Sequence, residues 1–163
     1  MSREQPNRDD VPMRNARLLR AYRVITLEDY WMGRDAAYRH ELTDAIARNA
    51  VVTVMRVNRV LDAMAADGLH AECKADSGSP VASGWRPAAV NRRVPAAVPD
   101  SPHITGAACD LYDPRNALDD WCMTHVEVLA QLDLWLEHPE YTDGWCHLQT
   151  VAPRCGSRVF RPW

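Results

Sequence analysis

The sequence lacks several features that would place it in a common class of protein. Its 163 residues carry a net charge of −3, and the basic residues are scattered, whereas nucleic-acid-binding proteins concentrate them in a stripe. No run of 18 or more apolar residues is present to span a membrane. Residues 1–20 are charged with no apolar stretch behind them, so we expect no secretory signal and synthesis in the cytoplasm. We therefore expect neither a nucleic-acid partner nor insertion into a membrane.

The sequence also lacks a paired arrangement of cysteines. It has five cysteines, an odd number, and none of them forms a C-x-x-C pair. A disulfide framework is uncommon in a cytoplasmic product of this size. We expect five reduced thiols, most of them buried as small apolar side chains.

What is present is the composition of an ordinary globular domain. Apolar residues make up 47% and charged residues 25% of the chain, and its length suits one compact domain. We expect residues 1–15 to be disordered and residues 16–163 to form a single domain. Helices are predicted within residues 25–68, because Thr26 and Asp29 have the spacing of a capping box and apolar residues then recur every three or four positions up to Gly68.

Residues 76–163 change in character and are expected to hold the functional core. The patterns predict short strands at residues 80–85 and 104–113, a short helix opened by Pro87, and a long helix over residues 113–139. Two further strands, 144–151 and 157–162, are expected to form a hairpin. Helices followed by a small antiparallel sheet with an inserted helix predict an α+β fold.

Three short phrases carry residue types suited to a metal site. They are SGWRPAAVN (residues 83–91), SPHITGAACD (residues 101–110) and GWCHLQ (residues 144–149). Catalytic zinc takes three imidazole or carboxylate ligands and keeps a fourth position open for water. His103, Asp110 and His147 provide such a set, and Gly106 lets the chain turn between the first two. From residue types alone, however, a histidine beside a tryptophan and an aspartate ending a strand are more often structural.

The order of these phrases resembles the M15 family of zinc D-Ala-D-Ala peptidases. That family includes VanX-like dipeptidases, L-Ala-D-Glu peptidases and phage endolysins, and its fold resembles the hedgehog signalling domain. SPHITGAACD matches the family pattern S-x-H-x-x-G-x-A-x-D, SGWRP is similar to its upstream S-G-x-R segment, and WCH to the segment of its last ligand. The resemblance covers roughly residues 80–150.

The resemblance implies a site and a reaction. It implies that His103, Asp110 and His147 bind zinc (Zn2+), and that an amide bond in peptidoglycan stem peptides is hydrolysed. It also implies that Arg86 neutralises a substrate carboxylate or carbonyl oxygen, which suits the chemistry of a guanidinium. Ser101 either hydrogen-bonds near the substrate or only shapes the turn before Pro102.

Two further residues are expected near the site. Trp145 lies two residues before His147, so on a strand it shares that ligand's face, where it forms a wall of the substrate site or packs in the core. Many family members place an acidic general base three residues before the last histidine, where this chain has Gly144. We predict that Asp143 takes this role if a turn at Gly144 directs it inward. The alternative is that Asp143 only forms the turn.

These patterns leave three functions to weigh. The first is a zinc peptidase of the cell wall, such as a phage or prophage lysis enzyme that acts once it is released. The second is a zinc-containing binding or structural protein without turnover, for example in a virion, which the absence of an acid at position 144 favours. The third is a cytoplasmic amidase with a small substrate. The sequence determines neither the bond that is cut nor the oligomeric state.

Overall fold

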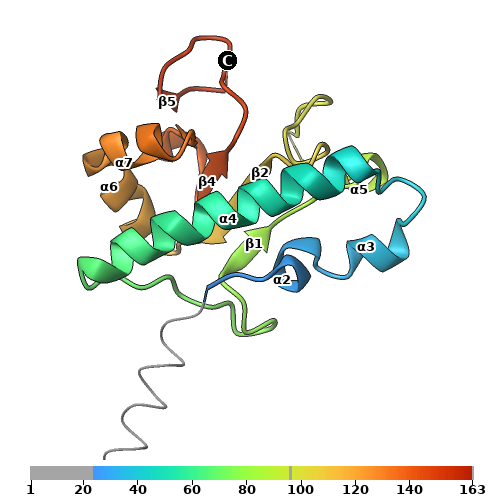
Figure 1. The fold of residues 1–163 in the computed structure, drawn as a ribbon, viewed down its shortest axis with the longest axis horizontal. Coiled ribbons are helices and arrows are strands. Elements are labelled where there is room, and N and C mark those ends of the chain that lie inside the picture. Colours follow the sequence, from blue (N-terminus) through green and yellow to red (C-terminus); the bar gives the residue numbers. More distant parts are fainter. Residues whose placement is uncertain (1–23, 96, 163) are drawn as a thin grey trace, which may run out of the picture.

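The computed structural model describes residues 24–95 and 97–162, which form an α+β fold around a five-stranded sheet (Figure 1). The strand order is β1-β2-β4-β3-β5. The strands are β1 (Val81–Ser83), β2 (Ala108–Tyr112), β3 (Trp135–Glu137), β4 (Trp145–Gln149) and β5 (Val159–Phe160). The helices are α2 (Leu27–Trp31), α3 (Arg34–Ala37), α4 (Asp44–Ala66), α5 (Ala88–Asn91), α6 (Ala117–Thr124) and α7 (Val126–Gln131), with a 3-10 turn, η1, at Pro139–Tyr141. The α+β class predicted from the sequence is confirmed, and the finer likeness to a hedgehog-type domain stays a prediction.

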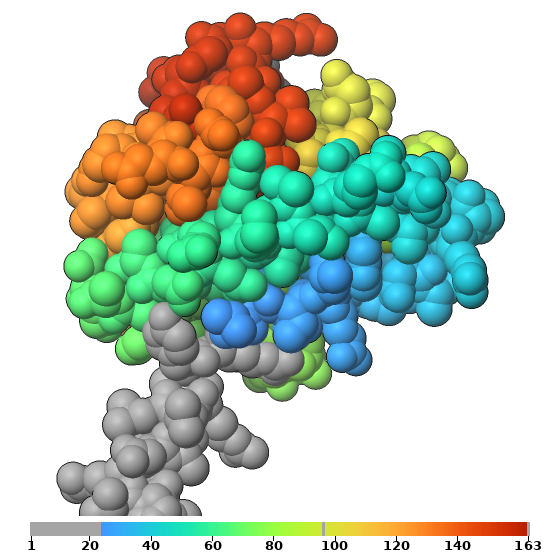
Figure 2. Space-filling model, in the orientation of Figure 1, coloured from blue at the N-terminus to red at the C-terminus, as the bar shows by residue number. Residues whose placement is uncertain are grey.

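Helix α4 covers one face of the sheet. It starts where the Thr43 side chain accepts a hydrogen bond from the Ile46 N–H, and it runs to Ala66 as the apolar spacing predicts. Its buried residues belong to the same apolar cluster as those of the middle strands, which are Cys109, Leu111, Leu136, Cys146 and Leu148. Figure 1 shows α4 lying in front of the sheet, and Figure 2 shows its residues across the near side of the molecule. Because strand side chains alternate between faces, the residues between these core positions point to the opposite face.

The chain before α4 is tied to the middle of the sheet. The predicted capping box is present, with Thr26 and Asp29 exchanging hydrogen bonds at the start of α2. The fully buried Tyr30 then donates its hydroxyl proton to the Ala108 carbonyl of β2, at 2.9 Å. Helix α2 is therefore anchored to the strand that carries Asp110.

The long helix predicted over residues 113–139 is wrong. The structure has α6 and α7 separated at His125, whose backbone leaves the helical region, and then β3. Helix α7 ends because Asp133 adopts a left-handed conformation (φ 48°) and the Leu134 N–H bonds back to the Leu129 carbonyl. This is a Schellman cap, which usually has glycine at the left-handed position. Because aspartate occupies that position here, no residue type in the sequence marks the end of the helix.

The predicted hairpin between the last two strands is also wrong. Strand β5 pairs with β3 and runs parallel to it, while β4 lies between β2 and β3. Both edges of β4 are thus occupied, so the chain after Gln149 must loop past β3 before it can join the sheet. The sheet is antiparallel except at this last pair, whereas the sequence predicted only antiparallel pairing.

The cysteines of the described residues are all free thiols. Cys109, Cys122 and Cys146 are buried in the core, as expected of small apolar side chains, while Cys73 and Cys155 are exposed. Among the same residues, no helix has both the length and the apolar character required to cross a bilayer.

Candidate metal centre

His103, Asp110 and His147 meet on the face of the sheet opposite α4. His103 lies in the loop before β2, Asp110 in the middle of β2, and His147 directly across from Asp110 on β4. One potential ligand atom from each side chain lies within 4.8 Å of the other two, and all three residues are buried. This group could hold a metal ion.

The ring orientations of the two histidines fit a cation between them and Asp110. His103 Nδ1 lies 2.8 Å from the Gly84 carbonyl oxygen, which can only accept, so the ring proton belongs on Nδ1. The Nε2 lone pair of His103 then faces Asp110 Oδ1 at 3.2 Å. Two acceptors repel each other unless a proton or a cation lies between them. Zinc–ligand bonds of about 2.0–2.2 Å place ligand atoms roughly 3.5 Å apart, close to this separation.

His147 repeats the pattern from the other side. Its Nε2 faces the side-chain oxygen of Gln149 at 3.3 Å, and its Nδ1 faces Asp110 Oδ1 at 2.7 Å. The Gln149 amide nitrogen donates to the Val151 carbonyl, which fixes the Gln149 oxygen toward the histidine. His147 in its neutral form therefore donates from Nε2 and presents Nδ1 to the ion. Each candidate ligand histidine thus has a partner that sets its tautomer, as is typical of protein metal sites.

The charges around the three side chains also suit a cation. Burial raises the pKa of Asp110, but the charges of the two histidines and their hydrogen bonds outweigh it, so the pKa is lowered and the carboxylate stays ionised. Burial lowers the pKa of His103 more than Asp110 raises it. For His147, burial lowers the pKa, but the bond to Asp110 outweighs it and the pKa is raised. His147 must therefore release its proton when a metal binds.

Arg86 contacts the second oxygen of the Asp110 carboxylate. Its Nη2 lies 3.3 Å from Asp110 Oδ2 and 3.3 Å from Ser83 Oγ, while Nη1 lies 3.4 Å from Asn91 Oδ1. The polar residues of the phrase SGWRPAAVN thus converge on one buried guanidinium. The sequence predicted Arg86 as a substrate-binding residue. It did not predict that Ser83 and Asn91 would hold Arg86 against Asp110 Oδ2, while Asp110 Oδ1 faces the two histidines.

Two glycines of these phrases are required by close approach to the N-terminal helices. A Cβ at Gly84 would lie 1.9 Å from the Tyr30 carbonyl oxygen, and one at Gly106 would lie 2.7 Å from the Ile46 carbonyl oxygen. Gly106 also has a φ of +77°, which confirms the turn predicted between His103 and β2. The helices before residue 68 therefore form the support against which the segment of Arg86 and the loop of His103 pack.

The remaining predicted residues lie at different distances from the centre. Ser101 is buried, and its backbone bonds to Val98 and Ile104 support the turn-forming interpretation. Trp145 is 37% exposed and pairs with Tyr112 at the start of β4, on the strand face that carries His147. Its role in binding substrate stays a prediction.

Asp143 is the predicted residue that the structure does not bring to the three ligands. It is exposed in the turn before β4, and no interaction that the structure shows joins it to His103, Asp110 or His147. Gly144 does adopt the left-handed conformation (φ 86°) that the prediction required. The turn is therefore present, but the side chain before it faces solvent.

Glu137 is a candidate functional residue that the sequence reasoning missed. Strand β3 pairs Trp135 with Gln149 and Leu136 with Leu148, and one further step of this register places Glu137 opposite His147. Glu137 is half-buried, and burial raises the pKa of its carboxyl group. The charge of His147 lowers this pKa and the charge of Asp110 raises it, but the overall direction is upward. The sequence carried no signal for it, because residues 113–139 were interpreted as one helix.

A second missed residue, Arg34, reaches the same region from α3. Its Nη1 donates to the Trp85 carbonyl at 2.7 Å, directly before Arg86 in the chain. Burial lowers the pKa of the half-buried Arg34 guanidinium, the charge of Arg86 lowers it further, and that of Asp110 raises it. Two guanidiniums and one carboxylate therefore lie near each other on this side of the candidate centre.

The contact between Gln149 and His147 leads to a testable prediction. In Gln149→Leu the Nε2–H of His147 loses its acceptor, so we expect zinc affinity to fall by about 10- to 100-fold, the usual effect of losing such a partner. Competition with a chromophoric chelator measures the change. The matched control is Gln131→Leu, at an exposed position on α7. Equal affinity in Gln149→Leu and the wild type would show that the contact does not orient the ring.

Comparison of the chain with models of protein families, with curated proteins and with solved structures finds no match. The resemblance to zinc peptidases thus rests on the three sequence phrases. The structure adds, independently of any relative, that the polar residues of those phrases converge around one buried His-Asp-His group.

Proposed function

We propose that this protein is a zinc-dependent peptidase that hydrolyses an amide bond in peptidoglycan stem peptides. The observation that carries the proposal is the convergence of His103, Asp110 and His147, in which His103 Nε2 and His147 Nδ1 both face Asp110 Oδ1. Two imidazole nitrogens and one carboxylate oxygen form a donor set typical of catalytic zinc, and three protein ligands leave one position open. The sequence resemblance supports the choice of reaction.

The protein's own residues have separable roles in this proposal. Zinc, when bound, supplies Lewis-acid polarisation of a carbonyl oxygen and lowers the pKa of water. Arg86 holds the Asp110 carboxylate through Oδ2 and so fixes the direction of Oδ1. A guanidinium has five N–H groups, and three contacts occupy three of them, so Arg86 keeps donors for the oxygen of a bound peptide.

The local charge supports a substrate that carries carboxylates. Arg34 and Arg86 contribute two positive charges near the centre, and Asp110 contributes one negative charge. A divalent cation would make the region more positive still. Stem peptides carry free carboxylates close to their amide bonds, so we expect Arg34 to favour them over neutral peptides through charge-assisted hydrogen bonds.

We propose that the protein is a phage or prophage lysis enzyme that acts on the cell wall after its release. One observation favours the second candidate, a zinc-containing structural or binding protein without turnover. Position 144 has no acid, and the neighbouring Asp143 is exposed and apart from the ligands. The two candidates differ in whether a bond is broken, so a cleavage assay separates them.

Metal removal tests the proposed function. Zinc-loaded protein is incubated with purified peptidoglycan of several chemotypes and with dipeptides, and new amino groups and product masses are recorded. We expect cleavage of the wall peptides, loss of cleavage after chelation and dialysis, and recovery on adding one equivalent of zinc. Zinc binding without cleavage of any substrate would support the structural protein. Cleavage of dipeptides alone would support a small-substrate amidase.

A further inference from the structure

We propose that Glu137, on β3, is the proton acceptor of this site and takes the role predicted for Asp143. The inference rests on the proposed function, because it names the residue that would serve that reaction. Its basis is the juxtaposition of an acidic residue on one strand with a candidate ligand on the next.

The strand register places Glu137 beside His147. The pairs Trp135–Gln149 and Leu136–Leu148 are antiparallel neighbours, and continuing this register by one residue brings Glu137 opposite His147. Directly opposed residues have Cβ atoms about 4.5–5.5 Å apart and project from the same face of the sheet. The alternation agrees, since Leu136 and Leu148 are both fully buried on the helix-covered face while Gln149 contacts the His147 ring on the other.

Strand β3 is held on both sides at this point. Glu137 pairs with Phe160 of β5, and the neighbouring His138 N–H donates to the Phe160 carbonyl at 2.8 Å. A carboxylate on a strand with partners at both edges has a better defined position than one in an exposed turn, such as Asp143. Catalytic groups need such positioning, because an offset of about 1 Å can cost roughly 100-fold in rate.

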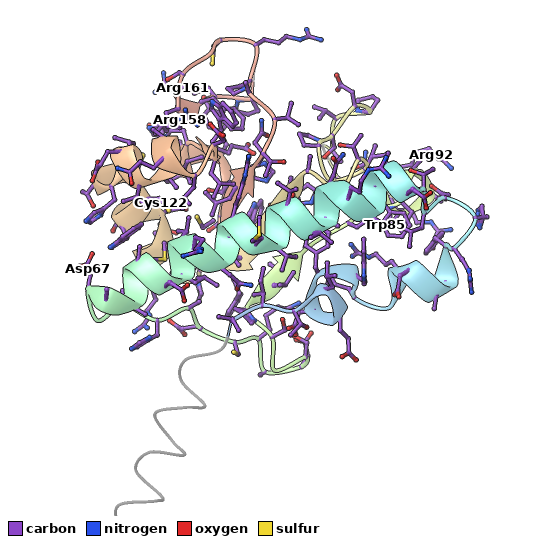
Figure 3. The ribbon with its side chains drawn as sticks, viewed as in Figure 1. Asp67, Trp85, Arg92, Cys122, Arg158 and Arg161 are labelled. Carbon is purple, nitrogen blue, oxygen red and sulfur yellow. The ribbon has the colours of Figure 1, made fainter. Side chains whose placement is uncertain are left out.

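The electrostatic surroundings of Glu137 support the assignment. Burial raises the pKa of the Glu137 carboxyl group, and the charges of His147 and Asp110 also act on this pKa. Two histidines in the chain before His147 have other partners. His125 stacks on Trp121 with ring centroids 4.1 Å apart, and His138 accepts a hydrogen bond from the Glu140 N–H. Figure 3 labels Arg158 and Arg161, the two residues that flank β5, the strand that pairs with β3.

The proposed proton transfers balance over one turnover. The Glu137 carboxylate accepts one proton from the attacking water as its oxygen forms a bond to the scissile carbonyl carbon. The protonated Glu137 then donates that proton to the leaving nitrogen as the C–N bond breaks. The products are a carboxylic acid, which ionises in water, and an amine, and Glu137 returns to its carboxylate form. Such transfer by a positioned side chain typically contributes 100- to 10,000-fold in rate.

The test compares Glu137→Gln with Asp143→Asn, each of which removes a charge and keeps the side-chain size. Three quantities are measured for both variants and the wild type. They are zinc affinity by chelator competition, cleavage of wall peptides, and the dissociation constant of acetohydroxamate from the zinc-loaded protein by calorimetry. Acetohydroxamate reports on the acceptor without turnover, because its acidic proton passes to a nearby carboxylate as the probe binds a metal. Thermal unfolding checks that each variant is folded.

We expect Glu137→Gln to bind zinc within about threefold of the wild type, to cleave at least about 100-fold more slowly, and to bind acetohydroxamate about tenfold more weakly. Asp143→Asn should match the wild type in all three. Loss of cleavage in Asp143→Asn with retention in Glu137→Gln would overturn the proposal, as would a Glu137→Gln variant that binds the probe like the wild type. A wild type that binds zinc and the probe but cleaves nothing would refute the proposed function alone, and weaker probe binding by Glu137→Gln would then still place its carboxylate at the site.

Discussion

Replacement of His147 by alanine should abolish tight binding of zinc and reduce any zinc-dependent cleavage by at least about 1,000-fold. The variant removes one of three ligands, and it removes the one that joins β4 to the Asp110 carboxylate at 2.7 Å. The two ligands that remain, His103 and Asp110, do not complete a tetrahedral set with one open position. Zinc content after dialysis and calorimetric titration measure the loss of binding.

Thermal unfolding gives a second measurement on the same variant. A ligand that binds only the folded state at 1,000 times its dissociation constant stabilises that state by about 4 kcal/mol. Zinc should therefore raise the melting temperature of the wild type and leave that of His147→Ala unchanged. His40→Ala, at an exposed position outside the candidate ligand set, is the control and should respond like the wild type. A His147→Ala variant that binds zinc as tightly as the wild type would refute the proposed ligand set.

Replacement of Gly84 by alanine should destabilise the metal-free protein by about 3 kcal/mol or more. The new Cβ would lie 1.9 Å from the Tyr30 carbonyl oxygen, which is backbone and cannot rotate away. Relief requires α2 to separate from the chain after β1. That movement weakens the hydrogen bond from the Trp85 N–H to the Tyr30 carbonyl, and it displaces the Gly84 carbonyl that holds His103. Zinc affinity should fall as well, because His103 loses its orienting acceptor.

Denaturant unfolding of the metal-free protein measures this effect. Gly68→Ala is the matched control, because a Cβ there meets nothing within 4 Å and its φ of +80° is the only source of strain. It should cost about 1 kcal/mol and leave zinc affinity unchanged. Similar stabilities for the Gly84 and Gly68 variants would show that the contact with Tyr30 tolerates an added methyl group.

The sequence predicted the candidate ligands because their phrases are short and chemically distinctive. His103 and Asp110 are seven residues apart with a glycine turn between them, so local geometry alone brings them close. Arg86 contacts Asp110, and Gly84 lies against Tyr30. These contacts join segments that tertiary packing brings together, so no local sequence pattern predicts them. The same holds for Arg34, because its contact with the Trp85 carbonyl joins residues 51 positions apart.

The failure over residues 113–139 had a specific cause. Apolar residues continued at helical spacing through Leu132 and Trp135, and the residue that ends α7 in the left-handed conformation is aspartate. Periodicity therefore favoured one long helix over a helix followed by a strand. The error extends to the site, because only a strand at Trp135–Glu137 brings Glu137 beside His147.

The pairing of β2 with β4 determines when, during synthesis, this chain could first capture a metal ion. Asp110 and His147 are 37 residues apart and meet only through that pairing. A growing chain that has left the ribosome as far as Asp110 offers two ligands. It cannot offer three until β4 has emerged and docked. Zinc would then stabilise the fold only of chains that extend past His147, and a chain truncated before that residue would not be stabilised by zinc.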